Sequence, residues 1–179
     1  MKSYKTEGFV IKRRNFGEAD RILTVFSKRS GKIQIKAPGV RRITSRRSSH
    51  TELLNYCVFG LYEGKKLPVL TEIESLENFQ SIKKNLGKIG VAYHFCELID
   101  GLCAENQENM EVFSLLKNTL SSLSSDEAEL NKLIENFEMR LLDILGFYKP
   151  EVTPKNFNRV VFIEQILERK LKSRQVVLC

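Results

Sequence analysis

The sequence has few of the residue patterns from which catalytic and metal sites are built. Its two histidines, His50 and His94, occur without HExxH or Cys-His spacing, and its four cysteines form no CxxC pair. Neither GxxxxGK(S/T) nor GxGxxG is present, so no nucleotide-binding loop is predicted. We interpret His94 as a helix residue with satisfied hydrogen bonds. We therefore expect a protein that is not an enzyme, with no catalytic residue, no cofactor and no bound metal.

Two further absences bear on location. The opening residues MKSYKTEGF lack the apolar core of a signal peptide, and no stretch approaches 18 uninterrupted apolar residues. The cysteines, at positions 57, 96, 103 and 179, lie far apart, which argues against a disulfide framework. We expect a cytoplasmic protein without a membrane partner.

Acidic residues are scarce at the start of the chain. Residues 1–50 contain 14 Lys and Arg but only 3 Asp and Glu, whereas residues 51–179 contain 15 and 19. The whole chain has a net charge of +7. A basic front joined to a mildly acidic remainder indicates nucleic acid or an anionic membrane as the partner, and of the two we expect nucleic acid.

The first 78 residues predict five strands separated by turn signals. The strands are expected at residues 4–16, from residue 21, and at 32–37, 53–64 and 67–76. Closely spaced strands of this kind are typical of a small barrel or sandwich. A five-stranded barrel with a basic open face is the description of an OB-fold.

The third of these strands, KIQIKA, alternates in character. Lys32, Gln34 and Lys36 share one face, because successive side chains of a strand point to opposite sides. This face is expected to present ammonium groups, while the other face enters the core. The following basic loop (residues 40–51) contains four arginines and no carboxylate. Such a loop favours a polyanion, although charge runs of this kind also occur merely as soluble surface.

Beyond residue 78 the apolar residues recur at the spacing of an α-helix. Helices are expected at 88–105, 110–123, 125–145 and from about 156. Ser124 and Glu127 have the spacing of a capping box for the third helix, and Gly146 is placed to end it. The fold class is therefore α+β, with a five-stranded OB-fold barrel at residues 1–78 and an all-α domain at 79–179.

Aromatic residues lie among the cations of the front, as they do in single-strand binders that stack bases on rings. Strand alternation buries about half of such rings. The candidates are Tyr4, Phe9, Phe16, Phe26, Tyr56, Phe59 and Tyr62.

The run GFVIKRRNFGEADRILTVFSKRSGKIQIKAPGVRR resembles the amino terminus of the RecO recombination mediators. Further similarity lies in LLDILGFYKP and ERKLKSRQ. The matching positions are Gly17, Glu18, Asp20, Arg21, Ile22, Leu23, Thr24, Phe26, Gly31, Lys32, Gly39, Arg41, Arg42 and Ser45.

This resemblance implies an OB-fold followed by a helical domain, in the bacterial cytoplasm or nucleoid. It implies binding to single- and double-stranded DNA, annealing of complementary strands, and recognition of the tail of single-stranded-DNA-binding protein. With RecR, such proteins help to load RecA. Many members carry a four-cysteine zinc module after the segment that matches LGFYKP. Glu151–Arg159 contains no cysteine, so we expect a shortened member without structural zinc.

The candidate contacts follow from the charge pattern and the resemblance. For DNA they are Arg13, Arg14, Arg21, Lys32, Lys36, Arg41, Arg42, Arg46 and Arg47. For the acidic partner tail they are Arg140, Lys170, Lys172 and Arg174, on two helices expected to lie side by side. The latter cations could instead simply complement a helix dipole.

Two other functions fit the same sequence. One is a general OB-fold protein that binds RNA or acts in translation, and the other is a protein-interaction scaffold whose basic face only confers solubility. An assay of strand annealing distinguishes a recombination mediator from both of these alternatives.

Overall fold

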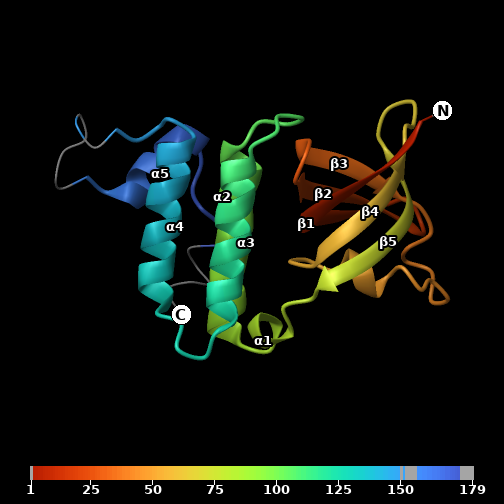
Figure 1. Cartoon of the computed structure of the whole chain (residues 1–179), viewed down its shortest axis with the longest axis horizontal. Coiled ribbons are helices and arrows are strands. Elements are labelled where there is room, and N and C mark those ends of the chain that lie inside the picture. Colours follow the sequence, from red (N-terminus) through yellow and green to blue (C-terminus); the bar gives the residue numbers. More distant parts are fainter. Residues whose placement is uncertain (1, 150, 152–156, 174–179) are drawn as a thin grey trace. The chain divides into compact units, whose positions relative to one another are not determined.

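The structure, a computed structural model, describes residues 2–149, 151 and 157–173 (Figure 1). The chain divides into two compact units. The first comprises residues 1–79 and 104–110, and the second comprises residues 80–103 and 111–179. The return of 104–110 to the first unit has no counterpart in the division expected from the sequence.

The first unit is a closed five-stranded barrel, which confirms the predicted α+β fold with an amino-terminal OB-type barrel. Its strands are β1 (Ser3–Phe16), β2 (Asp20–Ser27), β3 (Gly31–Ala37), β4 (Tyr56–Tyr62) and β5 (Val69–Glu77). The order around the barrel is β1-β2-β3-β5-β4. All neighbours are antiparallel except β3 and β5, which meet in parallel through Lys36 and Val69.

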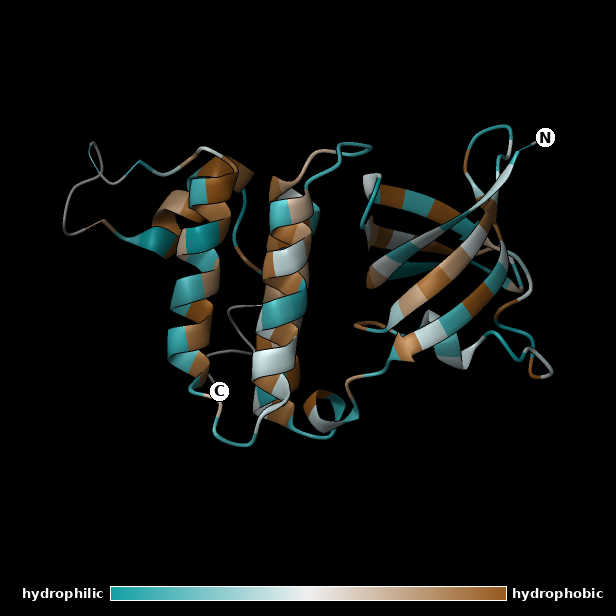
Figure 2. Cartoon of the chain, in the orientation of Figure 1, coloured by the Kyte–Doolittle hydropathy of each residue, from teal (hydrophilic) through white to brown (hydrophobic). Residues whose placement is uncertain are grey.

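Strand alternation builds the barrel core. Ile33, Ile35 and Ala37 of β3 are buried, together with Leu23 and Val25 of β2. These residues belong to one apolar cluster inside the barrel. The alternation of apolar and polar residues along the barrel strands is visible in Figure 2. The prediction that one face of β3 enters the core is confirmed.

The opposite face of β3 differs from the expectation. Lys32 is only 7% exposed, so the prediction that it presents its ammonium group at the surface is wrong. Residues 104–107 run beside this part of β3, where the Asn106 amide donates to the Lys32 carbonyl at 2.9 Å. Gln34 donates to Glu105 at 3.0 Å. A long-range segment therefore covers a face that looked open in the local pattern.

Gly31 makes the close approach of this segment possible. Its φ of +61° suits glycine, and a Cβ at this position would lie 1.8 Å from the Gln107 carbonyl oxygen. Any side chain here would displace residues 104–107.

The second unit is all-α in its described secondary structure. Its helices are α1 (Gln80–Lys83), α2 (Leu86–Leu102), α3 (Met110–Ser124), α4 (Leu130–Ile144) and α5 (Arg159–Leu167). The apolar positions predicted on α2 include Phe95, whose ring centroid lies 4.2 Å from that of Phe137 in α4. Both rings are buried, and they join two helices through the core of this unit.

The predicted start of α4 and the predicted end of α5 need correction, whereas the predicted end of α4 is confirmed. Ser124 does not cap α4, because it is the last residue of α3 and its hydroxyl donates to the Leu120 carbonyl. Helix α4 begins only at Leu130, after a connection that contains Glu127. The other end is confirmed, since Gly146 has a φ of +76° just after the helix. Helix α5 ends at Leu167, earlier than expected.

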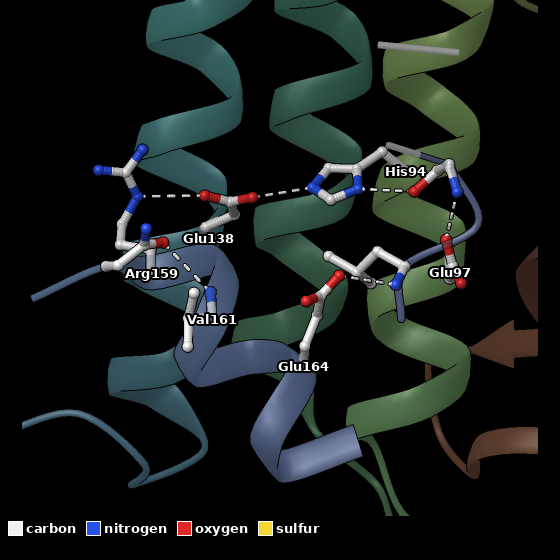
Figure 3. A network of polar contacts seen from close by, with 9 residues as sticks. His94, Glu97, Glu138, Arg159, Val161 and Glu164 are labelled. Carbon is white, nitrogen blue, oxygen red and sulfur yellow. Dashed lines mark hydrogen bonds and ion pairs between the residues drawn. The ribbon is translucent and has the colours of Figure 1, made fainter. Parts of the chain in front are cut away.

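A buried polar network connects α2, α4 and α5 (Figure 3). The two ring nitrogens of His94 lie 2.8 Å from Ser173 Oγ and 2.9 Å from Glu138 Oε1. Glu138 also accepts from Arg159 Nε at 3.1 Å. The prediction that His94 has satisfied hydrogen bonds is confirmed, and its role is structural.

Glu97 fixes the segment that follows α5 to α2. Its carboxylate accepts from the backbone amides of Lys172 and Ser173, at 3.1 and 2.8 Å, and forms an ion pair with Arg169. Burial alone would raise the pKa of Glu97, but the hydrogen bonds from Ser173, Arg169 and Lys172 outweigh it and bring the pKa to about 2.

We predict that Glu97 makes the stability of the protein depend on acid pH. Because its pKa is lower in the folded chain than the ordinary value of 4.5, its stabilisation is present above that pH and is lost as the pH falls towards 2. Glu97→Gln should lower the free energy of unfolding at pH 7 by on the order of 1–2 kcal/mol, allowing for solvent screening.

Urea unfolding between pH 7 and 3 measures this effect. The Glu97→Gln protein should show a flatter dependence of stability on pH than the parent, whereas Glu74→Gln, at an exposed site on β5, should not. Identical pH dependence in the parent and Glu97→Gln would contradict the assignment.

Candidate nucleic-acid interface

The cations of the barrel gather where β1 ends, β2 begins and β3 ends. The register pairs Phe16 with Asp20 across β1 and β2, and Arg21 with Ala37 across β2 and β3. The basic loop starts three residues after Ala37. Strand pairing therefore brings predicted DNA contacts from three strands and the loop to one end of the β2–β3 hairpin.

Asp20 holds the start of this loop. One of its carboxylate oxygens accepts from the Gly39 amide at 2.9 Å, and the other lies 3.3 Å from Lys36 Nζ. The hydrogen bond from Gly39, with a smaller contribution from Lys36, lowers the pKa of Asp20. Asp20 thus orients the turn and partly neutralises Lys36.

Arg47 holds the far side of the loop. Its guanidinium donates to the Pro38 carbonyl at 2.8 Å and to the Leu70 carbonyl at 3.1 Å, and lies 3.5 Å from the Thr71 carbonyl. These acceptors lie at the end of β3 and within β5. Arg47 is one of the expected DNA contacts, and its hydrogen bonds join the loop to the barrel.

Arg41 joins the loop to the β1–β2 turn. Its backbone amide donates to the Ala19 carbonyl at 2.9 Å, and its guanidinium donates to the Gly17 carbonyl at 3.1 Å. The side chain nevertheless remains exposed. Its acceptor is a neutral carbonyl, so no ion pair among the described residues offsets the charge of Arg41.

Arg13 and Arg21 both lie near the Glu52 carboxylate beside the loop. Arg13 pairs with Glu52 at 2.7 Å, and Arg21 donates to Thr51 Oγ1 at 3.4 Å. Arg21 Nε is buried and has no hydrogen-bond partner among the described residues. Burial, followed by the nearby charge of Arg13, lowers the pKa of Arg21, and Arg41 acts in the same direction. The excess of positive charge makes this cluster suited to an anion.

The remaining cations at this end point into solvent. Arg14, Arg42 and Arg46 are exposed. Within the described ranges, the side chains of Arg14 and Arg46 have neither a hydrogen bond nor an ion pair, and Arg42 contributes only a weak attraction to Asp20. Exposed guanidinium groups without a local carboxylate are the groups most available to phosphate.

The structure sorts the candidate rings. Phe9, Phe26, Tyr56 and Phe59 are buried and belong to the packing of the barrel. Phe16 is 46% exposed, with Lys36 Nζ 5.4 Å from its ring centroid. Of the seven candidates, Phe16 is therefore the ring best placed to receive a base.

The predicted partner-tail cations are not assembled as expected. Arg140 on α4 lies 3.7 Å from Asp143, and Lys170 lies 2.7 Å from Glu164. Lys170 and Lys172 follow the end of α5 at Leu167, so the expectation that they lie on the last helix is wrong. The apolar spacing alone predicts a longer helix, but α5 ends because Glu168 adopts a left-handed conformation, which the spacing does not indicate. Arg174 lies outside the described residues.

Neither a metal site nor a membrane span is found in the part of the chain that the structure describes. No group of three His, Cys, Asp or Glu side chains there is arranged to hold a metal ion, and no helix there is long and apolar enough to cross a membrane. Cys57, Cys96 and Cys103 are buried and form no disulfide among the described residues.

Two family models match this chain. Residues 1–79 match the family model described as Recombination protein O N terminal, and residues 83–153 match Recombination protein O C terminal. DNA repair protein RecO of Acetivibrio thermocellus is 37% identical over 147 residues, which cover 82% of this chain and 59% of the relative.

Two further relatives bear the same name. That of a Roseiflexus species is 36% identical over 83% of this chain and 52% of its own length, and that of Alkaliphilus metalliredigens is 34% identical over 83% and 60%. The matched region thus spans between half and two thirds of the length of these relatives.

The contacts predict that two neighbouring arginines differ in their effect on stability. Arg47→Ala should lower the free energy of unfolding by about 2 kcal/mol, because it removes charge-assisted hydrogen bonds and leaves backbone acceptors without a donor. Arg46→Ala should change it by less than about 0.5 kcal/mol, as expected for an exposed side chain. Urea unfolding measures both, and equal effects would show that Arg47 does not hold the loop.

Proposed function

Since the chain belongs to the RecO family of DNA repair proteins, we propose that its barrel binds single- and double-stranded DNA and anneals complementary strands. The observation that carries this proposal is the set of exposed arginines around the basic loop. Arg41, Arg42 and Arg46 extend from a loop without carboxylates, and Arg14 extends from the end of β1.

Charge neutralisation supplies the mechanism. Two complementary strands repel each other through their phosphates, and each phosphate bound by a cation releases condensed counterions and lowers that repulsion. Contacts to phosphate do not read the sequence, so they leave the base edges available for pairing. Annealing of this kind needs no bond chemistry, in agreement with the expectation that the protein is not an enzyme.

The proposed DNA contacts differ in rank. Arg14, Arg41, Arg42 and Arg46 are the primary contacts, because their charge is not neutralised. Lys36, Arg13 and Arg21 form a second set, since a phosphate near them must compete with Asp20 and Glu52. Lys32 and Arg47 are left out, because one is buried and the other is bound to the barrel.

The family implies partners as well, and these form the less direct part of the proposal. We propose that the protein acts with RecR in loading RecA onto DNA coated by single-stranded-DNA-binding protein, in the bacterial cytoplasm. Lys172, which is exposed, is the cation best placed for an acidic partner tail. Arg140 would first have to leave Asp143, and Lys170 would have to leave Glu164.

The alternatives are an RNA-binding or translation-associated protein and an interaction scaffold. Neither kind of protein would use the arginines of the loop to accelerate the annealing of DNA. A fluorescence assay of strand annealing, with bare strands and with strands coated by single-stranded-DNA-binding protein, therefore separates the proposal from both.

We predict that the salt dependence of DNA binding reports on the loop arginines. Arg42→Ala combined with Arg46→Ala should reduce the slope of log affinity against log salt for single strands by about 1.4, because each lost phosphate contact contributes about 0.7. The annealing rate should fall, while stability should hold, since both side chains are exposed.

A matched control removes two cations from the other end of the β2–β3 hairpin. Lys28→Ala combined with Arg29→Ala changes the net charge by the same amount but should leave the slope near that of the parent. Equal losses in the two double variants would show that total charge, rather than the loop, determines binding.

A further inference from the structure

The basic loop carries an apolar side chain in full contact with solvent. Ile43 is fully exposed, more so than the other large apolar residues described. Its neighbour Arg42, and Arg46 three residues further on, are exposed arginines. A single exposed aliphatic residue is ordinary on a protein surface, but its position amid these cations is not.

Ile43 lies in a turn whose backbone is held by hydrogen bonds. The Ser45 amide donates to the Arg42 carbonyl at 2.9 Å, and the Arg42 amide donates to the Gly39 carbonyl at 3.2 Å. Asp20 and Arg47 fix the two sides of the loop, as described above. The loop therefore presents Ile43 on a supported backbone, so little ordering is required when the side chain meets a ligand.

A second exposed apolar group lies on the neighbouring turn. Phe16 directly precedes Gly17, whose carbonyl accepts from the Arg41 guanidinium at 3.1 Å. Arg41 thus links the turn that follows Phe16 to the loop that carries Ile43. This end of the barrel thus carries two exposed apolar side chains as well as exposed arginines, which suits a ligand with anionic edges and apolar faces.

We propose that Ile43 is a wedge that enters between two neighbouring bases of bound DNA while Arg42 and Arg46 hold the adjacent phosphates. The inference rests on the proposed function and names the action of that site on its substrate. Apolar wedges of this type partly unstack a base step. The gain from burying an aliphatic side chain is of the same order as the cost of unstacking one step.

Charge and shape favour DNA as the occupant over an anionic membrane. A membrane-binding surface presents a broad apolar face, as on an amphipathic helix. Here one aliphatic group stands between two exposed arginines in the sequence, Arg42 and Arg46, whose charges suit phosphates. A base separated from its neighbour is also more accessible to its complement, so unstacking favours annealing.

Fluorescence of 2-aminopurine, which rises when the base is unstacked, tests the wedge. A single-stranded oligonucleotide with 2-aminopurine is titrated to saturation with the full chain, so that occupancy does not differ between variants. The parent should enhance emission severalfold, Ile43→Ser should lose most of this enhancement, and Ile43→Leu should retain it. Arg46→Ala should need more protein to saturate but then reach the parental emission.

The outcomes separate the wedge from DNA binding itself. Ile43→Ser should weaken binding by less than about tenfold, because the lost burial and the avoided unstacking oppose each other. If the parent binds DNA and emission is unchanged, or if Ile43→Ser matches the parent, the wedge is wrong while DNA binding stands. If the parent binds no DNA, the proposed function fails and the wedge fails with it. Ile43-dependent binding to vesicles of anionic phospholipid, without an effect on DNA, would overturn the wedge in favour of a membrane contact.

Discussion

The basic surface of this protein depends on holding arginines close together without neutralising them. Arg47 does this through backbone carbonyls, and Arg41 contacts a carbonyl of the adjoining turn. Asp20, a carboxylate at the start of the loop, is engaged by the Gly39 amide and by Lys36. Neutral acceptors therefore supply the anchoring, and the charges of the loop remain available to a polyanion.

In the helical unit, several cations are instead paired with carboxylates. Arg159 pairs with Glu135 and Glu138, Lys170 pairs with Glu164, and Arg169 pairs with Glu97. The pairs of Arg159 and Arg169 fix α5 and the segment after it to α4 and α2, and the pair of Lys170 joins that segment to α5. Paired cations contribute little net field at a distance, whereas the unpaired arginines of the barrel contribute a strong one. The charge asymmetry of the sequence thus corresponds to a difference between the two units. The barrel has unpaired arginines that suit a polyanion, and the helical unit is held together by internal ion pairs.

The sequence predicted the features that depend on local pattern. Alternation in KIQIKA indicated the buried Ile33 and Ile35, and the spacing of turn signals indicated five strands. It could not predict that residues 104–107 cover Lys32, because this contact joins positions more than 70 residues apart. Nor could it separate Arg46 from Arg47, since the two are chemically identical and differ only in whether carbonyls from β5 lie within reach. Ile43 was missed because a lone aliphatic residue in a loop gives no periodic signal.

The measurement that tests the central claim most directly is an NMR titration of ¹⁵N-labelled protein with a short single-stranded oligonucleotide. The account predicts that the largest amide shifts lie at residues 14–18 and 39–48, where neutral anchoring leaves the arginines charged. Shifts concentrated in the turn at residues 28–30, or spread over the ion-paired helical unit, would contradict it.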